Sequence, residues 1–245
     1  MTANRDAAGA PPATVAVVLA AGQGTRMGAA GNKVWLPLAG MPILARSLAV
    51  FERVAAVDET LLVASASELA QCRALVERYA LGKVRAIIAG GATRHASERC
   101  ALDALRARIT GGAVGMVLIH DAARPLVRPA EVARLVADAR RVGGALLAAP
   151  ALADESFLLA REDGAVAEWL APEWLARAQT PQAFAARPLL AAYDAAGEFE
   201  GTDTAATYAR AGHPVVATPG SADNLKITTP GDLARAERVL RARRR

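Results

Sequence analysis

Short apolar runs alternate with longer amphipathic segments along most of the chain. The apolar runs are rich in valine, isoleucine and leucine, and they predict strands at Val15–Ala20, Thr60–Ala64, Val84–Ala89, Met116–His120 and Ala145–Ala149. Helices are predicted between them at Ile43–Val54, Ser67–Tyr79, Ser97–Ile109 and Pro129–Val142. Strands that are apolar on both faces and alternate with helices are typical of a parallel sheet covered on both sides. We therefore expect a single α/β domain with a Rossmann-like, mostly parallel sheet.

The pattern breaks after Pro150. Residues 151–177 have weak periodicity, contain Trp169 and Trp174, and show no crossover helix. We interpret this segment as an arm or hairpin that projects from the domain. Beyond it, the α/β pattern predicts a strand at Thr180–Phe184, helices near 187–196 and 203–211, strands near 214–218 and 224–228, and a last helix from Pro230.

Composition places the chain among globular proteins. Of its 245 residues, 53% are hydrophobic and 22% charged, which suits one domain over 14–245. Residues 1–13 lack the apolar centre of a signal peptide and read as a disordered tail, and no apolar run is long enough to span a membrane. We expect a cytoplasmic protein in which Cys72 and Cys100 are reduced thiols. The net charge of +5 suits an anionic substrate, whereas 4% aromatic residues offer no stacking platform for nucleic acid.

The first predicted strand leads into a glycine-rich loop, VVLAAGQGTRMG, which is followed by Lys33. One interpretation is a plain strand-to-helix turn that needs glycine for its backbone angles. A dinucleotide cradle is disfavoured, because the third glycine, Gly28, comes one place late and no acid ends the next strand. The loop also lacks the G-K-[ST] of a P-loop. The remaining interpretation is a loop whose backbone N–H groups wrap a triphosphate, with Arg26 and Lys33 as cations.

Five motifs beyond this loop give the chain a family resemblance. They are GGATRHAS at 90–97, HDAARP at 120–125, TPQAF at 180–184, TD at 202–203 and NLKIT at 224–228. With AAGxGTRMG they resemble, in order, the motifs of the 2-C-methyl-D-erythritol 4-phosphate cytidylyltransferase family. The resemblance covers roughly residues 15–240 and implies a homodimeric, Mg²⁺-dependent enzyme that joins CTP to a polyol phosphate and releases pyrophosphate.

The resemblance assigns roles to individual residues. It implies catalytic roles for Arg26, Lys33 and Lys226. The cytidine nucleotide would be bound by Ala20, Ala21, Gly22, Gly24, Gly91, Ser97 and Ala122. The acceptor would be bound by Asp121, Arg124, Thr180 and Thr202, and the divalent metal by Asp121 and Asp223. Residues 151–177 would form the dimerisation and substrate arm.

Several of these residues have plainer interpretations. Lys226 could be an ordinary lysine at a strand end, and Arg124 a surface arginine. Asp121 follows an apolar run and so sits at a strand tip, where a carboxylate suits Mg²⁺ or a hydroxyl, but it could also cap the next helix. Ser97 could equally be a helix N-cap.

The chain departs from the family pattern mainly in its acceptor half. Ala92 stands where the family usually has aspartate, and Asn32 where it has proline. Glu155 replaces a threonine that touches the acceptor, and Pro172 occupies the place of an arm arginine. These departures keep open a cytidylyltransferase for another polyol phosphate, such as ribitol 5-phosphate. A nucleotide-binding protein without turnover is a further alternative, against which the retained cations and Asp121 argue.

Overall fold

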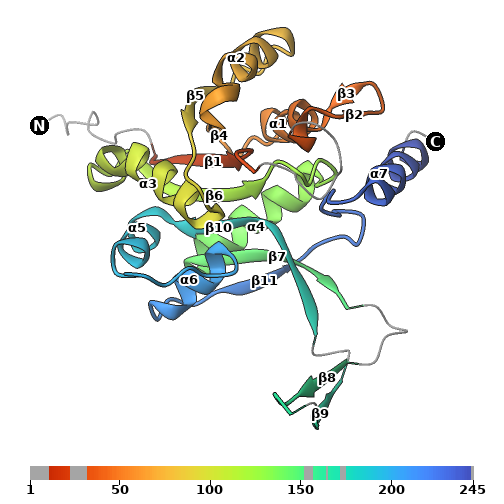
Figure 1. The fold of residues 1–245 in the computed structure, drawn as a ribbon. Coiled ribbons are helices and arrows are strands. Elements are labelled where there is room, and N and C mark those ends of the chain that lie inside the picture. Colours follow the sequence, from red (N-terminus) through yellow and green to blue (C-terminus); the bar gives the residue numbers. More distant parts are fainter. Residues whose placement is uncertain (1–10, 23–31, 152–156, 164, 172–174, 244–245) are drawn as a thin grey trace, which may run out of the picture.

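A seven-stranded sheet forms the centre of the computed structural model, which describes residues 11–22, 32–151, 157–163, 165–171 and 175–243 (Figure 1). Its strands, in spatial order, are β11 (Val216–Pro219), β7 (Gly144–Pro150), β10 (Ala176–Ala185), β6 (Val114–Asp121), β1 (Ala13–Leu19), β4 (Glu59–Ala64) and β5 (Val84–Ala89). All neighbours pair in parallel except β10, which runs antiparallel to both β6 and β7. The expected mostly parallel sheet is confirmed.

Helices cover both faces of this sheet. One face packs against α1 (Ile43–Glu52), α2 (Leu69–Arg78) and α4 (Pro129–Val142). The other packs against α3 (Arg94–Thr110), α5 (Ala186–Asp194) and α6 (Thr204–Arg210). Successive strand residues such as Val17 and Val18 face opposite clusters and are both fully buried, which explains the continuous apolar run in the sequence.

A third, smaller cluster lies beside the end of the chain. The last helix, α7 (Pro230–Ala242), packs there against the two-stranded hairpin of β2 (Pro37–Leu38) and β3 (Met41–Pro42). The hairpin turns at Ala39 and Gly40, which both have positive φ. This arrangement places the hairpin close to the segment that precedes α7, which contributes Ile227 to the same cluster.

Two details of the predicted elements are wrong. Residues 224–228 do not form a strand, because their backbone joins no sheet ladder; the N–H of Ile227 instead bonds to the carbonyl of Ala123 at 2.8 Å. Helix α3 begins at Arg94 rather than near Ser97, because the Thr93 hydroxyl caps it by accepting the Ala96 N–H at 3.0 Å. Ser97 is therefore not an N-cap.

The expected projecting hairpin is confirmed. Strands β8 (Phe157–Ala160) and β9 (Val166–Leu170) pair antiparallel, apart from the main sheet. In Figure 1 they extend away from the body of the molecule, below the ends of β7 and β10. Glu155, Pro172 and Trp174 lie outside the residues that the structure describes.

Candidate active site

Two adjoining cavities open at the carboxyl ends of β1 and β6, the edge at which open parallel sheets bind ligands. The larger has a volume of about 440 Å³ and the smaller about 190 Å³. The larger falls in the range of small-molecule sites. Both cavities are lined by Arg94, Asp121 and Lys226, which therefore mark the boundary between them.

The larger cavity is built from the segments that follow β1, β5 and β6 and from the segment that precedes α7. It is lined by Leu19, Ala20, Ala21, Gly22, Lys33, Val34, Gly91, Ala92, Thr93, Arg94, Ser97, Asp121, Ala123 and Lys226. The loop after β5 needs its second glycine, because a Cβ on Gly91 would lie 2.5 Å from the Cβ of Ala96. The Ser97 hydroxyl fixes this loop by accepting the Gly91 N–H at 3.2 Å and donating to the Thr93 carbonyl at 2.9 Å. These hydrogen bonds hold the backbone of this cavity wall in a fixed arrangement.

Asp121 is the centre of an ionic cluster at the boundary. It is the last residue of β6, as expected for a strand tip, and it caps no helix, since α4 begins only at Pro129. Its Oδ1 accepts from Arg94 Nε at 3.2 Å, and its Oδ2 pairs with Lys226 Nζ at 2.8 Å. Burial opposes ionisation of this carboxyl, but Arg94 and Lys226 outweigh it and hold its pKa well below its usual range.

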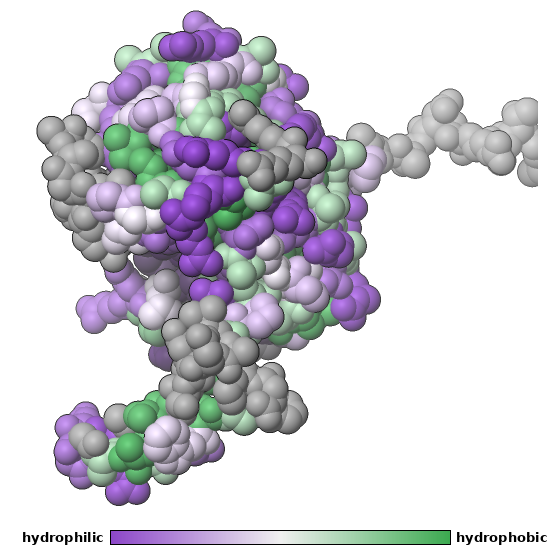
Figure 2. Space-filling model, turned by 90° about the vertical axis from the view of Figure 1, so that its right-hand side faces the viewer, coloured by the Kyte–Doolittle hydropathy of each residue, from purple (hydrophilic) through white to green (hydrophobic). Residues whose placement is uncertain are grey.

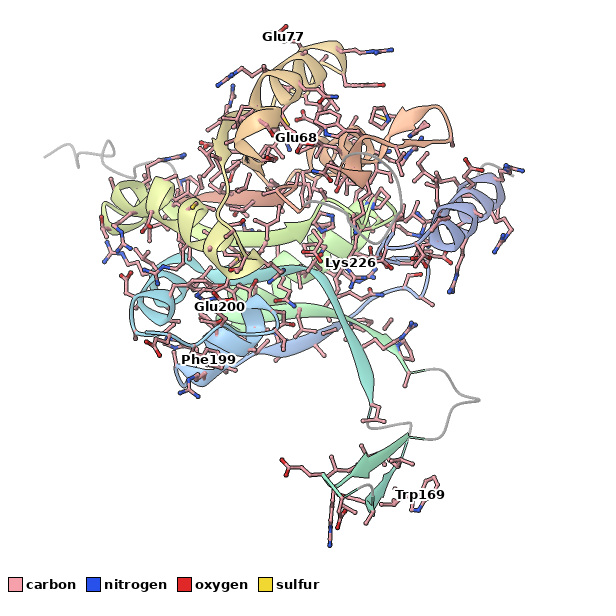
Figure 3. All side chains as sticks on the ribbon, viewed as in Figure 1. Glu68, Glu77, Trp169, Phe199, Glu200 and Lys226 are labelled. Atoms are coloured by element: carbon pink, nitrogen blue, oxygen red, sulfur yellow. The ribbon has the colours of Figure 1, made fainter. Side chains whose placement is uncertain are left out.

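Lys226 projects from the segment between β11 and α7 toward the sheet (Figure 3). The segment is anchored beside it, because Asn224 is fully buried and donates to the carbonyl of Thr180 at 3.0 Å. Ile227, on the other side, is also fully buried. Lys226 is thus held at the junction of the two cavities rather than at the end of a strand.

Arg94 forms an ion pair with a buried acid, Glu98, that the sequence analysis missed. Glu98, one turn along α3, accepts from Arg94 Nη1 at 2.6 Å. It also accepts from the hydroxyls of Tyr193 and Thr204, each at 2.6 Å. Burial raises the pKa of Glu98, against the opposing effect of Arg94 and the two hydroxyls. The quoted motif at 90–97 contains Arg94, but it gives no sign of Glu98.

The backbone of Asp121 is fixed by a buried polar chain. Its N–H donates to the hydroxyl oxygen of Thr180 at 3.0 Å, and that oxygen lies 3.3 Å from Nδ1 of His120. Nε2 of His120 lies 3.1 Å from the hydroxyl of Ser47 on α1. Burial lowers the pKa of His120 to about 3, so its ring stays neutral at physiological pH. We infer that His120 supports the strand tip rather than exchanging protons.

The smaller cavity combines cations with hydroxyl and amide groups. It is lined by Arg94, Asp121, Arg124, Ala178, Gln179, Thr180, Gln182, Thr202, Asp203 and Lys226. Arg124 donates to the carbonyl of Asn224 at 2.8 Å, so it is no loose surface residue. Burial lowers the pKa of Arg124, Asp121 opposes this, and the nearby charges of Arg94 and Arg177 lower it further. A group of crowded cations in a polar pocket suits an anionic ligand that also carries hydroxyls.

Most of the predicted site residues that the structure describes come together here. Ala122 is an exception, since it is fully buried and its N–H donates to the Leu19 carbonyl at 3.0 Å. Asp223 is another: it lines neither cavity, and its carboxylate pairs with Arg128 and Arg243, each at 3.4 Å. Arg26 and Gly24 lie outside the described residues.

The donor set for a divalent metal is small. Within the described ranges, no group of three or more His, Cys, Asp or Glu side chains could hold a metal ion. Asp121 faces both cavities, whereas Asp223 does not join it. A single carboxylate still suits Mg²⁺ where substrate phosphates supply other oxygens, since Mg²⁺ is commonly held in that way. The residues present therefore fit a metal that enters with a nucleotide.

Comparison with known proteins identifies the family. The model of the 2-C-methyl-D-erythritol 4-phosphate cytidylyltransferase family matches residues 14–242. The chain belongs to this family. A cytidylyltransferase of that name from Geobacter metallireducens is 43% identical over 232 residues, covering 94% of this chain and 98% of the relative. One from Cereibacter sphaeroides is 45% identical over 227 residues, covering 93% and 96%.

A solved structure supports the fold of this cytidylyltransferase family member. The 4-diphosphocytidyl-2C-methyl-D-erythritol synthase of Anaerococcus prevotii aligns with a TM-score of 0.80 and 24% identity, over 94% of this chain and 99% of that one. Across the residues that the structure covers, no helix is long and apolar enough to cross a membrane.

Proposed function

We propose that this protein transfers a cytidylyl group from CTP to the phosphate of 2-C-methyl-D-erythritol 4-phosphate and releases pyrophosphate, in isoprenoid biosynthesis. The observation that carries the proposal is the pair of cavities that meet at Arg94, Asp121 and Lys226. The larger cavity has the volume and backbone polar groups for a nucleotide. The smaller has cations and hydroxyls for a polyol phosphate. Family membership names the two substrates.

The chemistry needs positioning and charge more than proton transfer. An oxygen of the acceptor phosphate attacks the α-phosphorus of CTP, a new P–O bond forms, and the bond to the β-phosphate oxygen breaks. The attacking oxygen is already anionic, so no general base is required. Two anions must be brought together, and the charge on the α-phosphate and on the leaving pyrophosphate must be neutralised.

Lys33 and Lys226 divide this work between the two cavities. Lys33 lines only the larger cavity, where it would neutralise the triphosphate together with Arg26. Lys226 lines both, where it would hold the acceptor phosphate against the α-phosphate. In the smaller cavity, Arg124 and Thr180 would bind the phosphate and hydroxyls of the acceptor. A Mg²⁺ ion held by Asp121 and phosphate oxygens would supply further charge neutralisation.

Discrimination between the bases would come from the backbone beside Gly91 and Ser97. Because Ser97 holds that loop rigid, the carbonyl and N–H groups of the loop can distinguish the amino group of cytosine from the carbonyl of uracil.

We place the reaction in the cytoplasm, in keeping with the unpaired thiols of Cys72 and Cys100.

The projecting arm is proposed as the contact of a homodimer. Its large apolar side chains are exposed, with Leu158 at 45%, Leu159 at 53%, Val166 at 47% and Trp169 at 68%. Figure 2 shows green, apolar atoms on this projection beside purple ones, and Figure 3 shows the Trp169 side chain on it. Apolar groups exposed together mark an interaction surface.

Sedimentation of the wild-type protein at micromolar concentration should show a dimer. Trp169→Glu should weaken this dimer, because it places a charge among the exposed apolar side chains. A monomeric wild-type protein would refute the proposal.

Pyrophosphate release tests the function directly. With Mg²⁺ present, we expect turnover with CTP and methylerythritol phosphate, and at least about a hundredfold lower kcat/KM with UTP, since buried hydrogen bonds reject the wrong pattern. Ribitol 5-phosphate serves as the matched acceptor. Preference for ribitol 5-phosphate would reassign the acceptor. CTP binding without turnover of any polyol phosphate would show a nucleotide-binding protein that is not an enzyme.

A further inference from the structure

Lys33 lies in a short element that needs support from elsewhere. It begins η2 (Lys33–Trp35), one turn of 3₁₀ helix between the loop after β1 and the β2–β3 hairpin. Such a turn makes few hydrogen bonds of its own and is not stable in isolation. The position of its first side chain must therefore be fixed by contacts with other parts of the protein.

Glu68 supplies those contacts from a distant part of the chain. It lies after β4, at the junction of η3 (Ala66–Glu68) and α2. Its Oε1 accepts from the indole Nε1 of Trp35 at 2.7 Å, and its Oε2 accepts from Nδ2 of Asn32 at 3.0 Å. The Glu68 carboxylate thus accepts hydrogen bonds from Asn32, which precedes Lys33, and from Trp35, which lies two residues after it.

Asn32 connects these hydrogen bonds to the wall of the larger cavity. Its Nδ2 also donates to the carbonyl of Ala20 at 2.8 Å, and its Oδ1 accepts the Val34 N–H at 3.3 Å. Ala20, Lys33 and Val34 all line the larger cavity. The hydrogen bonds therefore join the end of β1, the turn that carries Lys33, and the start of α2 into one unit.

We propose that Glu68 is a positioning residue, which holds η2 through Asn32 and Trp35 so that Lys33 faces the triphosphate. This inference rests on the proposed function, because it takes Lys33 as a cation that acts on CTP. Only a carboxylate offers two acceptor oxygens here. Glutamine at 68 would present one oxygen and one N–H₂ group, and would repel one of the two donors.

The direct test compares three variants of the full-length protein. We expect Glu68→Gln and Glu68→Ala to lower kcat about tenfold to a hundredfold, the cost typical of a small misplacement of a reacting group, with a smaller change in KM for CTP. Glu77→Ala is the matched control, since Glu77 is an exposed acid near the other end of the same helix (Figure 3). Unchanged kcat in both Glu68 variants would overturn the proposal.

A double variant separates positioning from general support of the fold. If Glu68 acts through Lys33, adding Glu68→Ala to Lys33→Met should cost less than about threefold in kcat beyond Lys33→Met alone, because the positioned group is already gone. Independent, multiplicative losses would contradict this role. Should Lys33→Met keep full kcat, the assignment of Lys33 in the proposed function fails instead.

A measurement without substrate tests the hydrogen bond between Glu68 and Trp35. The indole N–H signal of Trp35, assigned with Trp35→Phe, should exchange with solvent at least about tenfold more slowly in the wild-type protein than in Glu68→Ala, because a paired N–H exchanges only on local opening. Glu77→Ala should leave this rate unchanged. Equal exchange in the wild-type protein and Glu68→Ala would overturn the proposal whatever the enzyme's activity.

Discussion

Lys33→Met should reduce kcat about a hundredfold to a thousandfold while weakening CTP binding far less. Loss of one preorganised donor to a developing charge typically costs this much in rate. Lys33 lines the nucleotide cavity, where methionine would fill a similar volume without the charge. Steady-state kinetics with both substrates saturating would give kcat, and calorimetric titration with CTP would give the dissociation constant.

Lys83→Met is the matched control for this substitution. Lys83 donates to the carbonyls of Phe51, Val54 and Val57 at 3.2, 2.8 and 2.7 Å, and it lines neither cavity. Its replacement should lower Tm and leave the kcat of the folded enzyme unchanged. If Lys33→Met instead behaves like Lys83→Met, the loop after β1 serves only the fold.

Asp121→Asn should have the second large effect, on both rate and stability. The substitution removes the negative charge that Arg94 and Lys226 share. Arg94 keeps its ion pair with Glu98, but Lys226 and Arg124 lose the carboxylate that faces them. We expect kcat to fall by a factor on the order of a hundred or more, and the free energy of unfolding at pH 7 to fall by about 3 kcal/mol. Denaturant titration measures the latter. Asp103→Asn, which breaks an exposed pair with Arg106, should leave the free energy of unfolding nearly unchanged.

The stability effect of Asp121→Asn should depend on pH in a defined direction. Because the pKa of Asp121 is lower in the folded than in the unfolded protein, its contribution is fully present above the unfolded value of about 3.9. It is lost as the pH falls toward the folded value. The difference between wild type and variant should therefore be constant above about pH 5 and shrink in more acidic solution. A difference that grew on acidification would contradict this account of the cluster.

The sequence predicts the sheet well because its signal is local. Residues such as Val17 and Val18 are apolar on both faces, and only a covered parallel sheet buries both. Where the outcome depended on contacts distant in sequence, prediction failed. Residues 224–228 look like a strand in composition, but their backbone bonds to the loop after β6 instead of to a strand. The sequence analysis made no prediction for the direction of β10, which runs antiparallel to both of its neighbours.

The site shows the same division. Motifs place Asp121 at a strand tip and single out Lys226, but no spacing indicates that these two side chains, far apart in sequence, pair at 2.8 Å. Glu98 and Glu68 escaped notice, since an isolated glutamate in a helical segment normally faces solvent. Their roles come from the elements packed around them, which the tertiary fold alone brings together. Arg26, Gly24, Glu155 and Pro172 stay predictions.

A crystal structure with the reaction product, the cytidine diphosphate-linked polyol, tests the central claim most directly. We predict cytosine beside Gly91 and Ser97 in the larger cavity, the polyol beside Arg124 and Thr180 in the smaller, and the diphosphate at Lys226 between them. Cytidine in the smaller cavity, or a diphosphate remote from both Asp121 and Lys226, would contradict the account.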